Sequence, residues 1–208
     1  MSIGFSEIGF YLFALLLLFI TPGPVWVALI ARALQNGFSG AWPLALGVAL
    51  GDIFWPALAL LSLGHIADFS TEILFWLRYL AVAVFVVMGV SLMLAPVQAV
   101  KADSALTKEG WLPGFLAGLF VIIGNPKAVL FYIGILPGFF NVGALGIMDI
   151  VVIALCSALV PFSGNLLLGF LVGKGASVIS APARRKRLNQ ISGIVLMAVG
   201  GLILFMGH

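Results

Sequence analysis

The sequence predicts an all-α integral membrane protein of six transmembrane helices, arranged as two inverted three-helix repeats with spans one and four broken at proline. The 208 residues are 63% hydrophobic and 8% charged, whereas soluble domains are about half apolar and a quarter charged. Lipid must cover this apolar excess, and long apolar runs cross lipid as helices because their backbone polar groups cannot reach water. We expect a single membrane domain over residues 1–208, with repeat one at about 1–98 and repeat two at about 110–208.

Six apolar runs reach the roughly 20 residues that a membrane-crossing helix needs. They cover about residues 8–31, 41–64, 73–95, 112–136, 150–173 and 190–207. No Lys or Arg precedes the first run, whereas Glu7 does, and the run is longer than the apolar part of a signal peptide. We therefore expect the first run to remain in the protein as a helix.

Basic residues follow spans one, three and five, and they set the predicted orientation because cytoplasmic loops are enriched in Lys and Arg. They are Arg32, Lys101, Lys108, Lys174 and the run Arg184–Arg187. The loops on the other side carry the acidic residues Glu7, Asp68, Glu72 and Asp149. Both termini are therefore predicted to be periplasmic. The basic run is expected to contact anionic lipid headgroups of the bilayer, and no nucleic acid is expected as a partner.

An internal repeat relates the first span to the fourth. Phe19–Pro24 and Ile123–Ala128 stand 104 residues apart, and each places a proline inside an apolar run. Proline interrupts the hydrogen-bond ladder of a helix, so both spans are expected to break near the membrane midplane, close to each other. Because each half contains three spans, the second half enters the membrane from the opposite side. Two simple proline kinks are the alternative interpretation.

The two breaks are the candidate binding site. Thr21-Pro22 and Asn125-Pro126 both resemble a helix N-cap followed by proline at the first helical position. A helix start presents unpaired N–H groups and partial positive charge, which suit a carboxylate. The carbonyl groups of Leu18 and Ile122, freed by the two prolines, could hold a cation or a water.

Two charged residues, Asp52 and Lys127, lie deep in apolar runs, where each unpaired charge costs roughly 2.5–3.5 kcal/mol. Lys127 also falls in the first turn of a predicted half-helix, where the dipole disfavours a cation. Its partner is either Asp52 permanently, as a structural pair, or Asp52 and a substrate carboxylate in turn. The predicted substrate-binding residues are Thr21, Pro22, Gly23, Pro24, Asp52, Asn125, Pro126 and Lys127. Asn165 is a reserve candidate, because such residues usually hydrogen-bond between helices.

Other classes of function find little support in the sequence. The two His residues lie at segment edges and Cys156 is the one cysteine, so we expect no enzyme, no cofactor and no metal site. A small-solute or ion channel and a non-transporting scaffold protein remain alternatives to a secondary transporter. The expected substrate is small and zwitterionic, a proton is the candidate coupling ion, and a homo-oligomer remains open.

The residues also carry a resemblance to a known family. Thr21–Pro24, Asp52 with the glycines before it, Asn125–Ala128 and Leu136-Pro137 are similar to motifs of the LysE/RhtB amino-acid exporter family (lysine exporter and homoserine-threonine efflux). The resemblance implies a bacterial inner-membrane protein that exports amino acids or their derivatives, driven by an ion gradient. Val25 and Gly138 depart from the family pattern, which commonly has Asn and Gln at these positions.

Overall fold

The computed structural model describes residues 3–64, 108–175 and 182–205, together with scattered positions between 76 and 94. Every element in the described ranges is helical, which confirms the predicted all-α class for them. The elements are α1 Phe5–Ile20, α2 Pro24–Gly64, α5 Trp111–Ile123, α6 Pro126–Phe139, η1 Val142–Ala144, α7 Ile147–Gly173 and α8 Pro182–Phe205.

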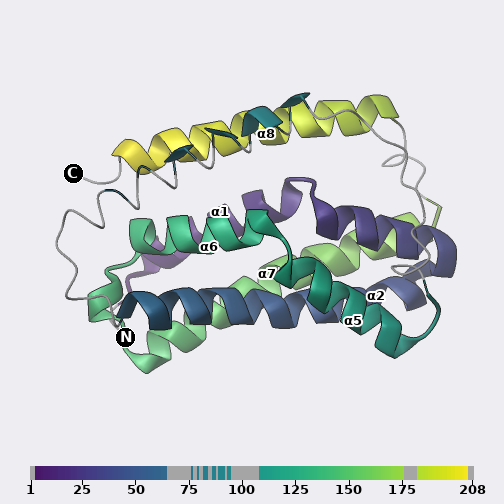
Figure 1. Ribbon diagram of the computed structural model, residues 1–208, viewed down its shortest axis with the longest axis horizontal. Helices are drawn as coiled ribbons and strands as arrows, with labels where there is room; N and C mark the ends of the chain where they lie inside the picture. Colours follow the sequence, from purple (N-terminus) through teal and green to yellow (C-terminus); the bar gives the residue numbers. More distant parts are fainter. Residues whose placement is uncertain are drawn as a thin grey trace.

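Helix α2 is two helical arms joined at a reversal. Gly37 has φ 65° and ψ −164°, a backbone conformation that residues with a Cβ rarely adopt. The first arm, 24–36, continues from α1, and the second arm, 38–64, runs back through the molecule (Figure 1). The two arms thus correspond to the second half of predicted span one and to predicted span two.

The second arm of α2 packs between α5 and α7, and glycines permit the close approach to α5. A Cβ on Gly118 would collide with the carbonyl oxygen of Leu44, and a Cβ on Gly47 would collide with that of Phe115. At both positions the absence of a side chain lets the two helix backbones come together, as small residues do in membrane helices. Gly138, by contrast, has no atom within 4 Å of where a Cβ would stand.

The described helices establish fewer membrane spans than the six predicted. By length and composition, Ile147–Gly173 and an apolar stretch within Pro24–Leu60 can cross a membrane, and the pair α5 and α6, bent by 52°, makes a third span if it counts as one. Predicted span three, 73–95, lies largely outside the described residues, as do Asp68, Glu72 and Lys101. The six-span inverted repeat therefore stays a prediction.

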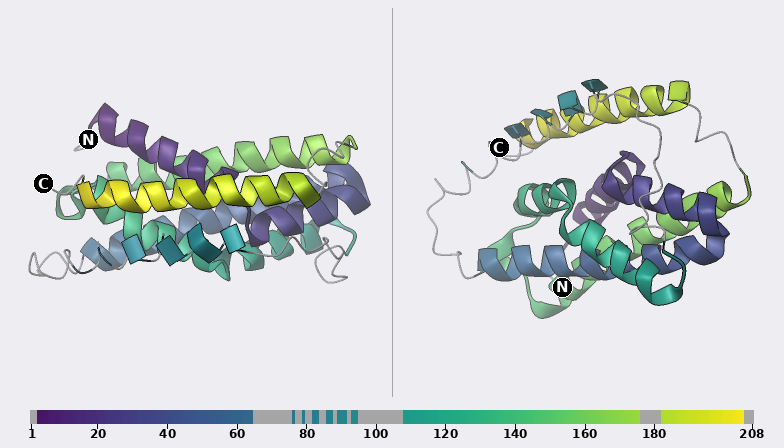
Figure 2. Two further views of the ribbon diagram at one scale, coloured as in Figure 1. Left: turned by 90° about the horizontal axis from the view of Figure 1, so that it is seen from above. Right: turned by 45° about the vertical axis from the view of Figure 1, so that its right-hand side comes forward.

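Several helices begin or end at one of two opposite ends of the molecule. The starts of α1 and α7 and the end of α8 lie at one end of the molecule, whereas the Gly37 reversal, the start of α5 and the start of α8 lie at the other (Figures 1 and 2). Arg32, read from the sequence as an orientation signal, is fully buried at the second end. It donates hydrogen bonds to the carbonyl oxygens of Gly40 at 2.7 Å, Lys108 at 3.0 Å and Gly110 at 3.0 Å. This side chain therefore joins the reversal to the start of α5.

Candidate functional site

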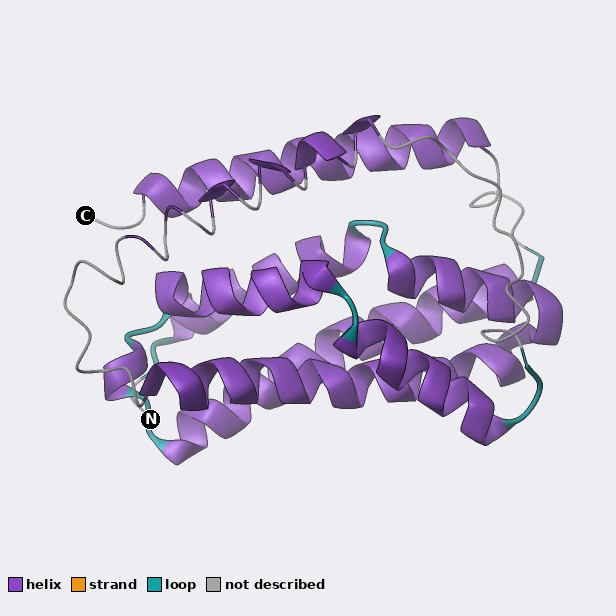
Figure 3. Cartoon of the chain, viewed as in Figure 1, coloured by secondary structure: helices purple, strands orange, loops and turns teal. Residues whose placement is uncertain are grey.

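The two predicted helix breaks are present and lie side by side in the middle of the molecule (Figure 3). One break falls between Ile20 and Pro24, and the other between Ile123 and Pro126. Hydrogen bonds from Lys127 in the second break to carbonyl groups of the first show directly that they meet.

The first break differs in detail from the prediction. Thr21 is the C-cap of α1, with ψ 115°, and α2 begins at Pro24, so the expected N-cap role of Thr21 before Pro22 is wrong. The hydroxyl of Thr21 instead donates to the Leu17 carbonyl oxygen at 2.6 Å. A residue before proline is pushed into extended conformation, and this restriction applies at both Thr21 and Gly23. A helix can therefore resume only at the second proline.

The second break follows the prediction. The Asn125 side chain accepts a hydrogen bond from the Lys127 N–H at 3.1 Å, and Pro126 is the first helical residue of α6. Asn125 is thus an N-cap followed by proline, the arrangement that starts helices most readily. Its side chain is 3% exposed, so the cap is built inside the protein.

Lys127 satisfies the carbonyl groups that the first break leaves free. Its ammonium Nζ donates to the Leu18 carbonyl oxygen at 2.8 Å and to the Thr21 carbonyl oxygen at 2.6 Å. Leu18 would normally receive the N–H of the residue four positions later, but that residue is Pro22. The end of α1 carries partial negative charge, so α1 stabilises a cation that α6 alone would disfavour.

Two tryptophan side chains donate hydrogen bonds to backbone carbonyl groups at the breaks. The indole N–H of Trp26 donates to the Phe19 carbonyl oxygen at 2.7 Å, and that of Trp55 donates to the Ile122 carbonyl oxygen at 3.2 Å. Neither tryptophan is among the residues that the sequence assigned to the site. The sequence does contain a signal for this role. The free carbonyl groups of an interrupted helix in an apolar segment need hydrogen-bond donors, and the indole N–H is a donor on an apolar ring.

Asp52 is buried beside the breaks with a different partner from the one expected. It is 2% exposed and accepts a hydrogen bond from the Tyr132 hydroxyl at 3.2 Å. Among the described residues, Asp52 and Lys127 do not form a direct ion pair, since the ammonium is held by carbonyl groups. The permanent structural pair considered from the sequence is therefore not what this structure contains.

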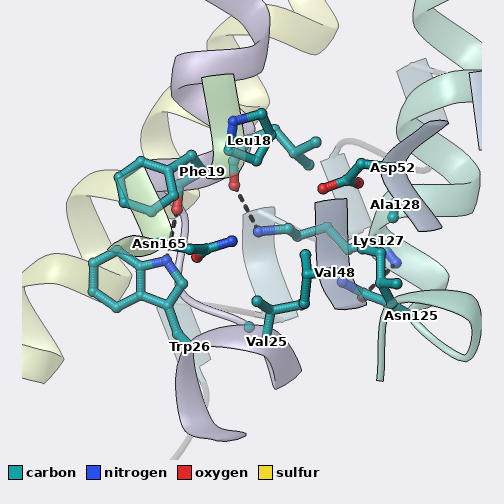
Figure 4. A pocket seen from close by; sticks show the side chains of 13 residues that line it. Leu18, Phe19, Val25, Trp26, Val48, Asp52, Asn125, Lys127, Ala128 and Asn165 are labelled. Carbon is teal, nitrogen blue, oxygen red and sulfur yellow. Dashed lines mark hydrogen bonds between the residues drawn. The ribbon is translucent and has the colours of Figure 1, made fainter. Parts of the chain in front are cut away.

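Asp52, Lys127 and Asn165 converge on one small cavity of about 40 Å³ (Figure 4). This volume exceeds the ~10–15 Å³ needed for one water. The Asn165 side chain is 2% exposed and its Oδ1 atom has no hydrogen-bond partner. The cavity is lined by Leu18, Phe19, Gly23, Val25, Trp26, Val48, Asp52, Ile122, Asn125, Lys127, Ala128, Pro161 and Asn165. Because buried polar atoms are nearly always paired, the unpaired Oδ1 makes Asn165, a reserve candidate from the sequence, a candidate ligand of this cavity.

The predicted site residues are thus only partly brought together. Gly23, Asp52, Asn125 and Lys127 line the cavity, whereas Thr21, Pro22, Pro24 and Pro126 shape the breaks around it. Of the two departures from the family pattern, Val25 lines the cavity and Gly138 does not. Within the described ranges, no cluster of three His, Cys, Asp or Glu residues could hold a metal ion.

Comparisons with known proteins match the chain to one family and to several membrane proteins. A family model described as LysE type translocator matches residues 16–207. The chain is similar to an uncharacterized membrane protein of Synechocystis, with 28% identity over 98% of both chains. It is also similar to an uncharacterized membrane protein of Pseudomonas aeruginosa, with 25% identity over 96% of this chain and 94% of that one. A third similar protein, an uncharacterized membrane protein of Bacillus subtilis, is 24% identical over 87% of this chain and 90% of that one. No solved structure matches the chain.

Proposed function

Because the chain belongs to the LysE type translocator family, a family of membrane transporters, we propose that it exports amino acids or small amino-acid derivatives across the bacterial inner membrane. The observation that carries this proposal is the cavity at the two helix breaks, where a cation, a carboxylate and an unpaired amide meet. Such a combination of opposite charges suits a zwitterion.

The substrate carboxylate is proposed to bind on the side of Lys127 and the start of α2. A lysine ammonium has three N–H donors, and the Leu18 and Thr21 carbonyl groups use two. The first hydrogen bond of α2 runs from the Val27 N–H to the Gly23 carbonyl. The N–H groups of Val25 and Trp26 come before it and, as at any helix start, have no partner inside the helix.

The substrate amino group is proposed to bind on the side of Asp52 and Asn165. Both are acceptors, both are 2% exposed, and both line the cavity. When no substrate is bound, Asp52 is the candidate carrier of a coupling proton. The cavity of about 40 Å³ holds one or a few waters rather than a whole amino acid, so binding requires the half-helices to separate.

The inverted repeat is part of this proposal, with both termini in the periplasm. The same offset of 104 residues that relates the two breaks also relates Gly89 to Gly193. A Cβ on Gly89 would stand 2.6 Å from the Gly193 carbonyl oxygen, so these two equivalent positions lie against each other. Contacts between equivalent residues are expected where repeats meet at a pseudo-two-fold axis.

Counterflow tests the function. Purified protein in proteoliposomes loaded with one unlabelled amino acid should take up the same labelled amino acid faster than unloaded vesicles do. A panel of neutral, basic and acidic amino acids would identify the substrate. The absence of counterflow for the whole panel, with protein correctly inserted, would reject amino-acid export, and fluxes too fast for a conformational cycle would indicate a channel.

A further inference from the structure

The end of α1 presents carbonyl oxygens that the helix itself cannot use. The Leu18 carbonyl loses its normal donor because Pro22 has no N–H. The Thr21 carbonyl belongs to the C-cap residue, beyond which Pro22 and Gly23 are not helical and α2 begins at Pro24. Two free carbonyl groups at the negative end of a helix dipole are the elements from which broken-helix transporters build sites for sodium ions.

This cluster of carbonyl groups is occupied by a cation that belongs to the chain. The Lys127 Nζ lies 2.8 Å from the Leu18 oxygen and 2.6 Å from the Thr21 oxygen. Lys127 comes from α6, which lies more than 100 residues later in the sequence. A single charged group therefore joins the two breaks in the way that a bound metal ion would.

Further oxygen atoms lie around the same cavity. The Asn165 Oδ1 is buried without a partner, and the Asp52 carboxylate lines the cavity as well. Gly23 lies beside the ammonium, since a Cβ on this glycine would be in ordinary contact with Nζ at 3.6 Å. Carbonyl, amide and carboxylate oxygens together form the ligand set that hard cations prefer.

We propose that the Lys127 ammonium replaces a monovalent metal ion, and that shortening this side chain opens a sodium site formed by the carbonyl groups of Leu18 and Thr21. In the parent protein the Lys127 ammonium already fills the site, so neither the stability of the protein nor its transport depends on sodium. The inference concerns cation binding and stands independently of which solute the protein carries.

The test is thermal unfolding of Lys127→Ala, purified in detergent and followed by tryptophan fluorescence. Choline chloride is replaced by sodium chloride at constant ionic strength. With sodium at about ten times its Kd, the melting temperature of the variant should rise by about 4 °C. Propylammonium, which supplies the atoms that the substitution removes, should also stabilise the variant and should abolish the response to sodium. The parent protein should respond to neither cation.

Two control variants define the outcome. Lys127→Gln keeps N–H donors for the carbonyl groups and should not respond to sodium. Lys174→Ala removes a lysine whose ammonium lies over the Phe170 ring, away from the breaks, and should behave as the parent does. If Lys127→Ala cannot be purified in either salt, Lys127→Ser, whose hydroxyl adds a ligand, takes its place.

An assembled Lys127→Ala that ignores sodium would overturn the proposal, even if propylammonium stabilises it. An equal sodium response in the parent protein would overturn it too, because the ion would then bind elsewhere. Since unfolding requires no transported solute, a failure here is distinct from a failure of counterflow.

Discussion

At the scale of single residues, the site depends on where the charge of Lys127 is stabilised. A lysine in the first turn of α6 is unfavourable for its own helix, and from the sequence an anion was the expected remedy. The structure provides the end of α1 instead, through the Leu18 and Thr21 carbonyl groups. Asp52, bonded to Tyr132, is therefore not consumed in a structural ion pair and remains available to a substrate or a proton.

Asp52→Asn should strongly reduce gradient-driven export while leaving an assembled protein. Asparagine keeps the size of the side chain and still accepts a hydrogen bond from Tyr132, but it cannot carry a negative charge. We expect export to fall by roughly tenfold or more, because the substrate loses one charge-assisted hydrogen bond. Glu7→Gln is the matched control, because Glu7 caps the exposed start of α1 and lies outside the cavity. Export at the parent rate in Asp52→Asn, at normal membrane abundance, would remove Asp52 from the site.

Combining Asp52→Asn with Lys127→Met should not restore transport. If the two residues served only to neutralise each other, removing both would leave no lone charge and activity would return. In this structure the double substitution also leaves the Leu18 and Thr21 carbonyl groups without their donor. Counterflow in the double variant at the parent rate would defeat the assignment of both residues to the substrate site.

Trp26→Phe should lower stability, because the Phe19 carbonyl loses the indole N–H that it receives at 2.7 Å. Leaving a fully buried acceptor unsatisfied costs about 1–3 kcal/mol, and since this bond is part-buried we expect a loss of about 1 kcal/mol, which thermal unfolding in detergent can measure. Trp111→Phe is the control, since the Trp111 ring is 47% exposed and stacks on Phe115, a contact that phenylalanine keeps. Equal melting temperatures for the two variants would argue against a capping role for Trp26.

At the scale of helices, the sequence contained the positions of the breaks but not their donors. Asn125-Pro126 is a local signal, and the N-cap formed as predicted. At Thr21 the same local rule failed, because Pro24 follows closely and delays the start of the next helix. The donors from Lys127 and Trp55 come from other helices. Local patterns can therefore locate an interruption, whereas its partners depend on packing between distant segments.

Gly118→Ala should destabilise the contact between α2 and α5, because the new Cβ would overlap the Leu44 carbonyl oxygen. Backbone on both sides must shift, and overpacking of this kind typically costs about 1–3 kcal/mol. Gly138→Ala makes the same chemical change in α6, where nothing lies within 4 Å of the new atom, and should be neutral. The melting temperatures of the two purified variants test this difference, and an equally stable Gly118→Ala would contradict the close approach.

At the scale of the whole molecule, the distribution of basic and acidic residues along the sequence predicted which helix ends lie at the same end of the molecule. The Gly37 reversal and the start of α5 lie at one end, joined by the buried Arg32. The starts of α1 and α7 lie at the other end, where Glu7 and Asp149 accept hydrogen bonds from Gly4 and Gly146. The carboxylates of Glu7 and Asp149 therefore cap their helices, and both lie at the same end of the molecule. No local pattern could show that Arg32 would be buried, because that depends on two loops meeting.

The side of the membrane that each end faces can be tested by thiol labelling of single cysteines in a Cys156→Ala background. Phe5→Cys places a thiol at the start of α1, where the side chain is 98% exposed. Arg185→Cys places one in the basic segment that begins α8. Because Lys and Arg are retained on the cytoplasmic side, a membrane-impermeant reagent should label position 5 in cells whose outer membrane alone is opened. Position 185 should react only after the inner membrane is also permeabilised. Labelling of position 185 from the periplasm would reverse the predicted orientation, because the basic start of α8 would then lie outside the cell.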